Sequence, residues 1–290
     1  MDYFESRLVR SGLSALLVMV LASSQPLALS PGSEVLIPAA ARSGPWVTDL
    51  YLLNLGDGDT EVQLQWLVRG QSNPSPQLVE LSLAQGETRV LADVIFTEFS
   101  LYRSEGAIRI VASDRVVANC RIYARDGDAT YGQGFEGVPA AAATTAGATS
   151  HVVGLATDGG FRSNIYALAG SDGAVVELSL QLPSGQEVAS AQLELEAWEP
   201  YLEPVSRVFG VGALDNATVE LRVSSGSTVV GASKIDELTT DPTTLASWIE
   251  ARPTTRMPAG SYFGAVIRPD TAASGGFALS LDDAEAVSYT

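Results

Sequence analysis

Two distant stretches of the chain carry the same pattern, and this repetition limits the folds that the sequence can adopt. WVTDLYLL (46–53) aligns with FRSNIYAL (161–168) at an offset of 115 residues. The aligned positions keep their chemical type, as in Thr48 with Ser163, Asp49 with Asn164 and Tyr51 with Tyr166. Further along, VVANCRI (116–122) aligns with VVGASKI (229–235). This repetition predicts one structural unit present twice.

Each copy consists of short runs of alternating apolar and polar residues separated by turn residues. In the first copy the runs fall near residues 34–38, 47–54, 61–68, 78–83, 87–91, 106–112 and 115–124. A period of two indicates strands that are half-buried, and seven such runs in about a hundred residues predict an antiparallel β-sandwich. The sequence therefore predicts an all-β fold with two tandem sandwiches.

Short helical turns interrupt this pattern. Asp93 is placed to cap a turn at VIFTEF, and VSRVFG predicts a second turn that ends at Gly210. A third helix is predicted at 242–250, with Asp241 as N-cap and Pro242 in the first position.

The domain boundaries follow from changes in composition. We expect a signal peptide at 1–28, sandwich repeats at 33–138 and 151–252, an Ala/Thr-rich linker at 139–150 and a C-terminal β extension at 253–290. The extension alternates, as in GGFALSL (275–281), but is too short to form a domain. It is expected to pair with the second repeat or with another chain.

The N-terminus carries a targeting signal. Arg7 and Arg10 precede the apolar run Leu13–Ala22, and Ser23 and Ser24 follow it. This order of charged, apolar and small residues is typical of a secretory signal peptide, although a buried first helix would give a related pattern. We expect cleavage after Ser24 or Ala28, no membrane insertion afterwards, and a secreted, periplasmic or cell-surface protein.

The net charge of the chain limits the classes of partner that it is expected to bind. Acidic residues number 34 against 17 basic ones, which gives a formal net charge of −17. Such a surface repels nucleic-acid phosphates and anionic lipids, so neither is an expected partner.

The supply of reactive side chains excludes several chemistries. The chain has one cysteine, Cys120, in the strand-like stretch VVANCRIYA, which indicates a buried thiol without a disulfide partner. One histidine, His151, lies at the edge of the linker, and no G-x-S-x-G motif accompanies it. A single Cys and a single His cannot supply a zinc site, and the sequence predicts no catalytic residue and no cofactor.

Two groups of aspartates are the candidate metal ligands. Asp57 and Asp59 belong to a Gly-Asp-Gly-Asp segment, and Asp126 and Asp128 flank a glycine. Asp-Gly between strands favours a β-hairpin turn in both places, and calcium is the alternative.

Aromatic and acidic residues leave two further options open. Rings can stack on sugars, but Trp66 shares the inward parity of its strand, which favours core packing. The aromatic candidates are Trp46, Trp66, Trp198, Trp248, Tyr51 and Tyr166. Paired carboxylates could serve a glycosidase, but spacing alone selects no pair.

One phrase of the sequence carries a family resemblance. W-x-T-D-L-x-L-x-N-x-G, from Trp46 to Gly56, followed by V-x-L-x-W, resembles poorly characterised exported bacterial proteins with tandem Ig-like β-sandwich repeats. It is also similar, more distantly, to cell-adhesion-related β-sandwich modules of bacterial surface proteins. The resemblance implies fold and location, and no functional residue follows from it.

Two hypotheses on function result. The favoured one is a non-catalytic extracytoplasmic binding or structural module for adhesion or envelope association. Its partner would be an envelope or extracellular protein or a glycan, with possible self-association through the C-terminal strands. The alternative is a carboxylate-dependent polysaccharide hydrolase or lyase.

Overall fold

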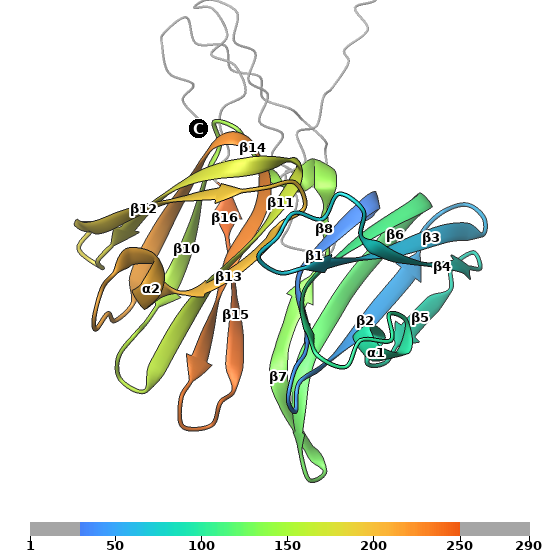
Figure 1. Cartoon of the computed structure of the whole chain (residues 1–290), viewed down its shortest axis with the longest axis horizontal. Helices are drawn as coiled ribbons and strands as arrows, with labels where there is room; N and C mark the ends of the chain where they lie inside the picture. Colours follow the sequence, from blue (N-terminus) through green and yellow to red (C-terminus); the bar gives the residue numbers. More distant parts are fainter. Residues whose placement is uncertain (1–29, 250–290) are drawn as a thin grey trace, which may run out of the picture.

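Two eight-stranded antiparallel sheets follow one another along the chain and confirm the all-β prediction. The computed structural model describes residues 30–249. The predicted signal peptide and C-terminal extension lie outside these residues. In Figure 1 the two sheets stand side by side, and we call them the first half (β1–β8, 32–139) and the second half (β9–β16, 144–249).

The first sheet has the order β4-β3-β6-β1-β8, with β2 between β5 and β6 and with β7 added to β6. Its elements are β1 (Gly32–Arg42), β2 (Val47–Asn54), β3 (Thr60–Val68), β4 (Gln77–Leu83), β5 (Thr88–Leu91), α1 (Val94–Thr97), β6 (Ser104–Asp126), β7 (Ala129–Glu136) and β8 (Val138–Pro139). Strand β6 pairs with β1 and β3 mostly along its first part and with β2 and β7 along its second. The sheet therefore folds over into a sandwich-like pair of layers.

The second sheet repeats this order of pairing as β12-β11-β14-β10-β16, with β13, β15 and β9 added beside it. Its elements are β9 (Thr144–Thr145), β10 (Thr149–Leu155), β11 (Phe161–Gln181), β12 (Glu187–Leu195), β13 (Pro200–Pro204), α2 (Val205–Phe209), β14 (Ala217–Asp236), β15 (Pro242–Ala246) and β16 (Trp248–Ile249). Strand β14 takes the place of β6, and the single strand β11 takes the place of β2 and β3. A short 3-10 helix (Ala140–Ala142) and β9 lie within the predicted linker.

The alternation seen in the sequence becomes alternating burial in the strands. Along β2, residues Thr48, Leu50, Leu52 and Asn54 are buried and their neighbours are partly exposed. Trp66 is buried in the core between the layers, as its parity predicts. Each half has a core of its own, because the inward residues of both layers face each other.

The two halves pack directly against one another. Leu36, Leu67 and Ala107 of the first half bury a small apolar cluster with Leu168 and Val229 of the second. This shared cluster holds the halves in a defined relation, so that the space left between them has a defined shape.

A hydrogen-bonded loop adds to this contact. The Asn73 amide donates from Nδ2 to the backbone oxygen of Trp198 at 2.9 Å, and its backbone N–H donates to Ala197 at 3.1 Å. The Gly70 N–H donates to the backbone oxygen of Pro200 at 2.9 Å. The loop between β3 and β4 is thereby fastened to the β12–β13 connection.

One of the two predicted Asp-Gly hairpins is wrong. Strands β2 and β3, on either side of residues 56–59, do not pair with each other. Each pairs with a different part of the long strand β6 instead. The segment carries the chain from one layer to the other, and residues 170–173 lie inside the continuous strand β11 at a shift in its register. The second prediction is confirmed, since β6 and β7 pair directly around Gly127, where φ is 58°.

The predicted helix at 242–250 is also wrong. Residues Pro242–Ala246 form β15 against β14, and Trp248–Ile249 form β16 against β10. An Asp-Pro pair can begin a helix, but a proline also fits the first position of an edge strand. The open edge of β14 supplies backbone partners that an isolated helical turn would lack.

Helix α1 forms where it is predicted, but Asp93 does not cap it through its side chain. Its carboxylate instead pairs with Arg42. The prediction for α2 holds, since Gly210 ends that helix with φ at 65°. The predicted strands 106–112 and 115–124 join into the one long strand β6.

Candidate functional site

A cavity of about 510 Å³ lies between the two halves. The first half lines it with residues of β1, the loop before β2 and β7, and the second half lines it with β11, β13 and the end of β14. The halves also touch between β7 and β15, where Thr244 donates its hydroxyl to the backbone oxygen of Gly134 at 2.7 Å. It exists because the halves touch at the shared apolar cluster and again at β7 and β15.

Aromatic rings make up much of its wall. Trp46 and Tyr131 meet edge to face, with ring centroids 5.4 Å apart and an interplanar angle of 84°. Phe135 and Tyr166 do the same across the two halves at 5.3 Å and 79°. Tyr201 adds a fifth ring from β13. The wall therefore offers apolar faces and edges together with a few polar tips.

Charged groups lie at the exposed side of the cavity. Arg69 and Glu105 form an ion pair with 2.7 Å between Nη1 and Oε2, and both side chains are 40% exposed. Arg162 is exposed as well. Among the described residues that line the cavity, Glu105 is the single carboxylate.

The two halves share one hydrogen-bonding device at the strand beside the cavity. In the first half, the Ala41 N–H donates to Thr48 Oγ1 at 2.9 Å, and the Thr48 hydroxyl donates to the Ala41 oxygen at 2.7 Å. In the second, Ala156 and Ser163 make the same two bonds, both at 2.9 Å. Each pair is seven residues apart, and the two pairs differ by the same offset of 115 residues found in the sequence.

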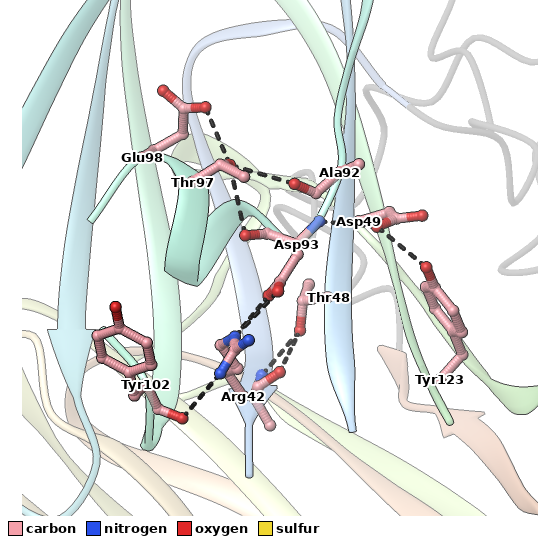
Figure 2. Close-up of polar contacts among 10 residues, drawn as sticks. Arg42, Thr48, Asp49, Ala92, Asp93, Thr97, Glu98, Tyr102 and Tyr123 are labelled. Carbon is pink, nitrogen blue, oxygen red and sulfur yellow. Dashed lines mark hydrogen bonds and ion pairs between the residues drawn. The ribbon is translucent and has the colours of Figure 1, made fainter. Parts of the chain in front are cut away.

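The residues that follow Thr48 and Ser163, Asp49 and Asn164, differ in their hydrogen-bond partners. In the first half, Asp49 Oδ1 accepts from the Asp93 N–H at 2.9 Å and from the Tyr123 hydroxyl at 3.4 Å. Arg42 holds Asp93 through two bonds to its carboxylate at 2.9 and 3.0 Å, and it donates from Nη1 to the Tyr102 oxygen. Figure 2 shows this network, in which each carboxylate has a protein partner.

In the second half, the equivalent side chain has lost both donors. Two residues, Ala92 and Asp93, separate β5 from helix α1, whereas α2 begins directly after β13. Pro204, the last residue of β13, lies opposite Asn164 and has no N–H to donate. The strand register shifts the sequence alignment of 116–122 with 229–235 by one residue, because Ile235 lies opposite Arg162 as Tyr123 lies opposite Val47. An apolar side chain therefore stands where the first half has the hydroxyl. The buried Oδ1 of Asn164 consequently has no hydrogen-bond partner in the described part of the chain.

Tyr166 contributes a hydroxyl to the same wall. It lies two residues after Asn164 on β11, is 4% exposed and lines the same cavity. Its hydroxyl makes no hydrogen bond with any of residues 30–249, and its ring lies across Gly231, where a Cβ would collide with it. Burial raises the pKa of Tyr166 well above its usual value, so the phenol remains a neutral donor.

The aspartates that the sequence offered as metal ligands lie in turns. Asn54 organises the 56–59 segment: its Nδ2 donates to the oxygens of Gly58, Leu83 and Ala84, and its Oδ1 accepts from Gly56 and Thr60. Asp57 and Asp59 contribute to this loop through a backbone N–H and through Oδ1, respectively. Within residues 30–249 there is no group of three or more His, Cys, Asp or Glu that could hold a metal ion.

The remaining sequence candidates are placed as follows. Cys120 is buried, and burial raises the pKa of its thiol to about 12, as the prediction of an unreactive thiol requires. His151 lies in β10 opposite Glu220, away from the cavity-lining residues. Trp46 and Tyr166 do reach the cavity, whereas Trp198 stacks under Arg109, 4.2 Å from the guanidinium carbon to the ring centroid.

Sequence reasoning missed the parts of the site that come from β7. Tyr131, Gln133 and Phe135 alternate with glycines, and their run follows the Asp-Gly turn without a strong apolar pattern. The alternation itself was the available signal. The alignment did identify Asn164 and Tyr166 as counterparts of Asp49 and Tyr51, but it did not indicate that their surroundings differ.

Comparisons with known proteins add little to this picture. No model of a known protein family matches the sequence, and no curated protein matches it. A solved structure of a Thermotoga maritima protein, Thermotoga maritima 1070, aligns with 37% of this chain and 94% of its own, at 12% identity and a TM-score of 0.32. A score this low supports no inference about fold or function. In the described part of the chain, none of the helices has the length and apolar character needed to cross a bilayer.

Proposed function

We propose that this chain is a non-catalytic extracytoplasmic binding module, and that the cavity between its halves is the ligand site. The observation that carries the proposal is the cavity itself: about 510 Å³, walled by aromatic rings and containing the buried Asn164 Oδ1, which has no hydrogen-bond partner among residues 30–249. Ligand sites are usually concave, largely apolar and equipped with a few polar groups, with volumes of roughly 300–1,000 Å³.

The proposal includes the origin of the cavity. The two halves are two copies of one Ig-like sandwich, as the resemblance to exported bacterial tandem-repeat proteins implies. The shared order of strand pairing and the matching Thr48 and Ser163 hydrogen bonds support this interpretation. If one sandwich was duplicated and the two copies then diverged, the first copy would keep Asp49 paired within the protein. The second copy would leave Asn164 available to a ligand.

Binding fits the geometry better than cleavage does. A polysaccharide hydrolase usually places two carboxylates on opposite sides of the scissile bond. Glu105 is the single carboxylate among the described residues around this cavity, and it is already paired with Arg69. The alternative of a carboxylate-dependent hydrolase or lyase therefore gains no support from this cavity.

Location outside the cytoplasm rests on the N-terminal pattern of Arg7, Arg10 and the apolar run that follows. The net charge of −17 disfavours nucleic acid as a partner and favours a neutral ligand or an envelope protein or glycan.

A fragment screen by two-dimensional NMR tests this function. The labelled chain would be mixed with small neutral, charged, aromatic and polyhydroxylated fragments, and the shifted amide and indole signals would be mapped. The proposal expects the shifts to gather at Trp46, Tyr131 and Asn164. Shifts scattered over other surfaces, or an absence of binders in the whole screen, would contradict it.

A matched pair of variants sharpens the test. Ser43 lines the cavity and bonds to Trp46 through its backbone, so Ser43→Trp adds a large side chain to the cavity without removing those bonds. Ser82 is exposed on β4, so Ser82→Trp is the control. The first variant should abolish the shifts of any fragment that binds in the cavity, and the second should leave them unchanged.

A further inference from the structure

Two neighbouring side chains on one face of β11, Asn164 and Tyr166, line the cavity and carry polar groups that make no hydrogen bond within residues 30–249. Asn164 offers an acceptor, Oδ1, with no partner in the described residues, and Tyr166 offers a hydroxyl that makes no hydrogen bond there. Residues at positions i and i+2 of a strand lie on the same face, so both groups reach the same space. Buried polar groups are nearly always paired, and an exception requires an explanation.

The unpaired oxygen of Asn164 follows from a local difference between the two halves. The first half satisfies the equivalent Asp49 with a backbone N–H and a tyrosine hydroxyl. In the second half neither Pro204, which lies opposite Asn164, nor Ile235 can donate a hydrogen bond, yet a polar side chain is kept at 164. An apolar residue would remove the cost of an unpaired carbonyl, so the retained amide points to a partner other than residues 30–249.

The two groups define what that partner must offer. Asn164 Oδ1 needs a donor, and the Tyr166 hydroxyl can donate to an acceptor and accept from a donor. A hydroxyl group of a ligand can play both parts. A carboxylate has no proton for Asn164 Oδ1 at neutral pH, and any anion would place a negative charge beside this buried carbonyl oxygen.

The remainder of the cavity suits the apolar faces of such a ligand. Trp46 is half-buried and held edge to face by Tyr131, so its ring is oriented before a ligand arrives. Flat aromatic surfaces of this kind accept the C–H face of a sugar ring. The Arg69–Glu105 pair is neutral as a unit and Arg162 is exposed, so charge contributes little at the depth of the site.

We infer that the cavity binds a neutral saccharide. One sugar hydroxyl donates to Asn164 Oδ1, a second oxygen accepts from the Tyr166 hydroxyl, and the sugar ring lies against Trp46. This inference rests on the proposed function, since it names the ligand class of the same cavity. Asn164 and Tyr166 are then specificity-determining residues, because they select hydroxyl groups over apolar or anionic ones.

Titration calorimetry with the full chain tests the inference. The probes are cellobiose, maltose and N,N′-diacetylchitobiose, with digalacturonate as an anionic comparison. At least one neutral disaccharide should bind, and Asn164→Leu and Tyr166→Phe should each weaken it about tenfold, the effect of one lost hydrogen bond in a buried site. Tyr51→Phe, at the equivalent position of the first half, should leave the affinity unchanged.

Thermal melting separates a binding role from a structural one. In the absence of sugar, Asn164→Leu should melt at the same temperature as the unmodified chain or higher, because it removes an unpaired carbonyl. A large drop in melting temperature would show that Asn164 serves the fold and would overturn the assignment. Tyr166→Phe keeps the ring contact with Phe135, so its effect on affinity remains measurable if Asn164→Leu fails to fold.

A neutral apolar dye, N-phenyl-1-naphthylamine, distinguishes the two levels of the proposal. If the dye binds, Ser43→Trp blocks it and no neutral disaccharide binds at millimolar concentration, the saccharide inference falls while the ligand site stands. If neither dye nor sugar binds, both fall. Tighter binding of digalacturonate than of every neutral disaccharide would also overturn the inference.

Discussion

Asp49 and Asn164 occupy the same place in the two halves of the molecule and have opposite surroundings. Asp49 is held by two donors from its own half, and its neighbour Asp93 is held by Arg42. Asn164 has the same strand position, but its carbonyl oxygen lies at a cavity and has no hydrogen-bond partner among residues 30–249. Two sheets with the same order of strand pairing can therefore differ at one polar position, which is hydrogen-bonded in one half and unpaired within residues 30–249 in the other.

The hydroxyls of Thr48 and Ser163, which make the same two hydrogen bonds in each half, should give the largest losses of stability, and these losses should be similar. Thr48→Val and Ser163→Ala each leave a backbone N–H and a carbonyl without the hydroxyl that joins them. Both hydroxyls are buried, so each variant should lower the free energy of unfolding by about 3 kcal/mol, measured by urea denaturation. Effects that differ by more than twofold between the halves would break the equivalence on which the comparison depends.

The hydrogen bonds of Asp49 have no counterpart at Asn164, so removing them should lower stability by a smaller amount and in the first half alone. Asp49→Leu removes the acceptor for the Asp93 N–H and for the Tyr123 hydroxyl. We expect a loss of about 2 kcal/mol in the free energy of unfolding, since hydrogen bonds to charged groups contribute roughly 1.5–3 kcal/mol. Tyr123→Phe should reproduce only a small part of this loss, because its bond is the longer one. An unchanged stability in Asp49→Leu would show that the network is not structural.

A buried thiol distinguishes the halves at alkaline pH. Cys120 lies opposite Leu50, and the equivalent position opposite Ile165 is Ala232. Burial raises the Cys120 pKa from 9.0 to about 12, so the unfolded chain releases a proton that the folded chain keeps. The stability gained from this difference is complete below pH 9 and declines as pH rises toward 12, by about 1.4 kcal/mol per pH unit.

Chemical denaturation at several pH values between 8 and 11 checks this sign, as these values bracket the lower pKa of 9.0. The unmodified chain should lose stability relative to Cys120→Ala as pH rises, and its thiol should react with Ellman's reagent only when the chain is unfolded. Parallel pH curves for the two proteins would contradict the assignment.

The Asp57–Asp59 loop should give a weaker effect. Asn54 supplies most of the hydrogen bonds there, so the double variant Asp57→Asn with Asp59→Asn should change stability by no more than about 0.5 kcal/mol. EGTA should leave the melting temperature unchanged. A drop on adding EGTA that calcium reverses would restore the metal hypothesis.

Much of the fold follows from local pattern, because burial on one face of a strand requires alternation. The strands around Leu50, Leu64 and Val176 are predicted for this reason, and the offset of 115 residues follows from their repetition. The failures concern partners that lie far apart in sequence. The residues at 56–59 resemble a hairpin turn until β6 is known to run beside both flanking strands.

The site could be predicted only in part for the same reason. Asn164 and Tyr166 are visible in the alignment, but the missing donors depend on Pro204 and Ile235, which come from two other strands. The cavity depends on how the halves pack, and Phe135 of β7 meets Tyr166 across that interface. No pattern within one segment encodes such a meeting.

The most direct test of the account is the stability of Asn164→Leu compared with Asp49→Leu in the absence of ligand. The free energy of unfolding would be measured for both by urea denaturation under one set of conditions. The account predicts that Asn164→Leu is unchanged or slightly more stable, by up to about 1 kcal/mol, since it removes an unpaired buried acceptor. A loss in Asn164→Leu as large as that in Asp49→Leu would show that Asn164 has a structural partner, and the account of a freed binding group would be wrong.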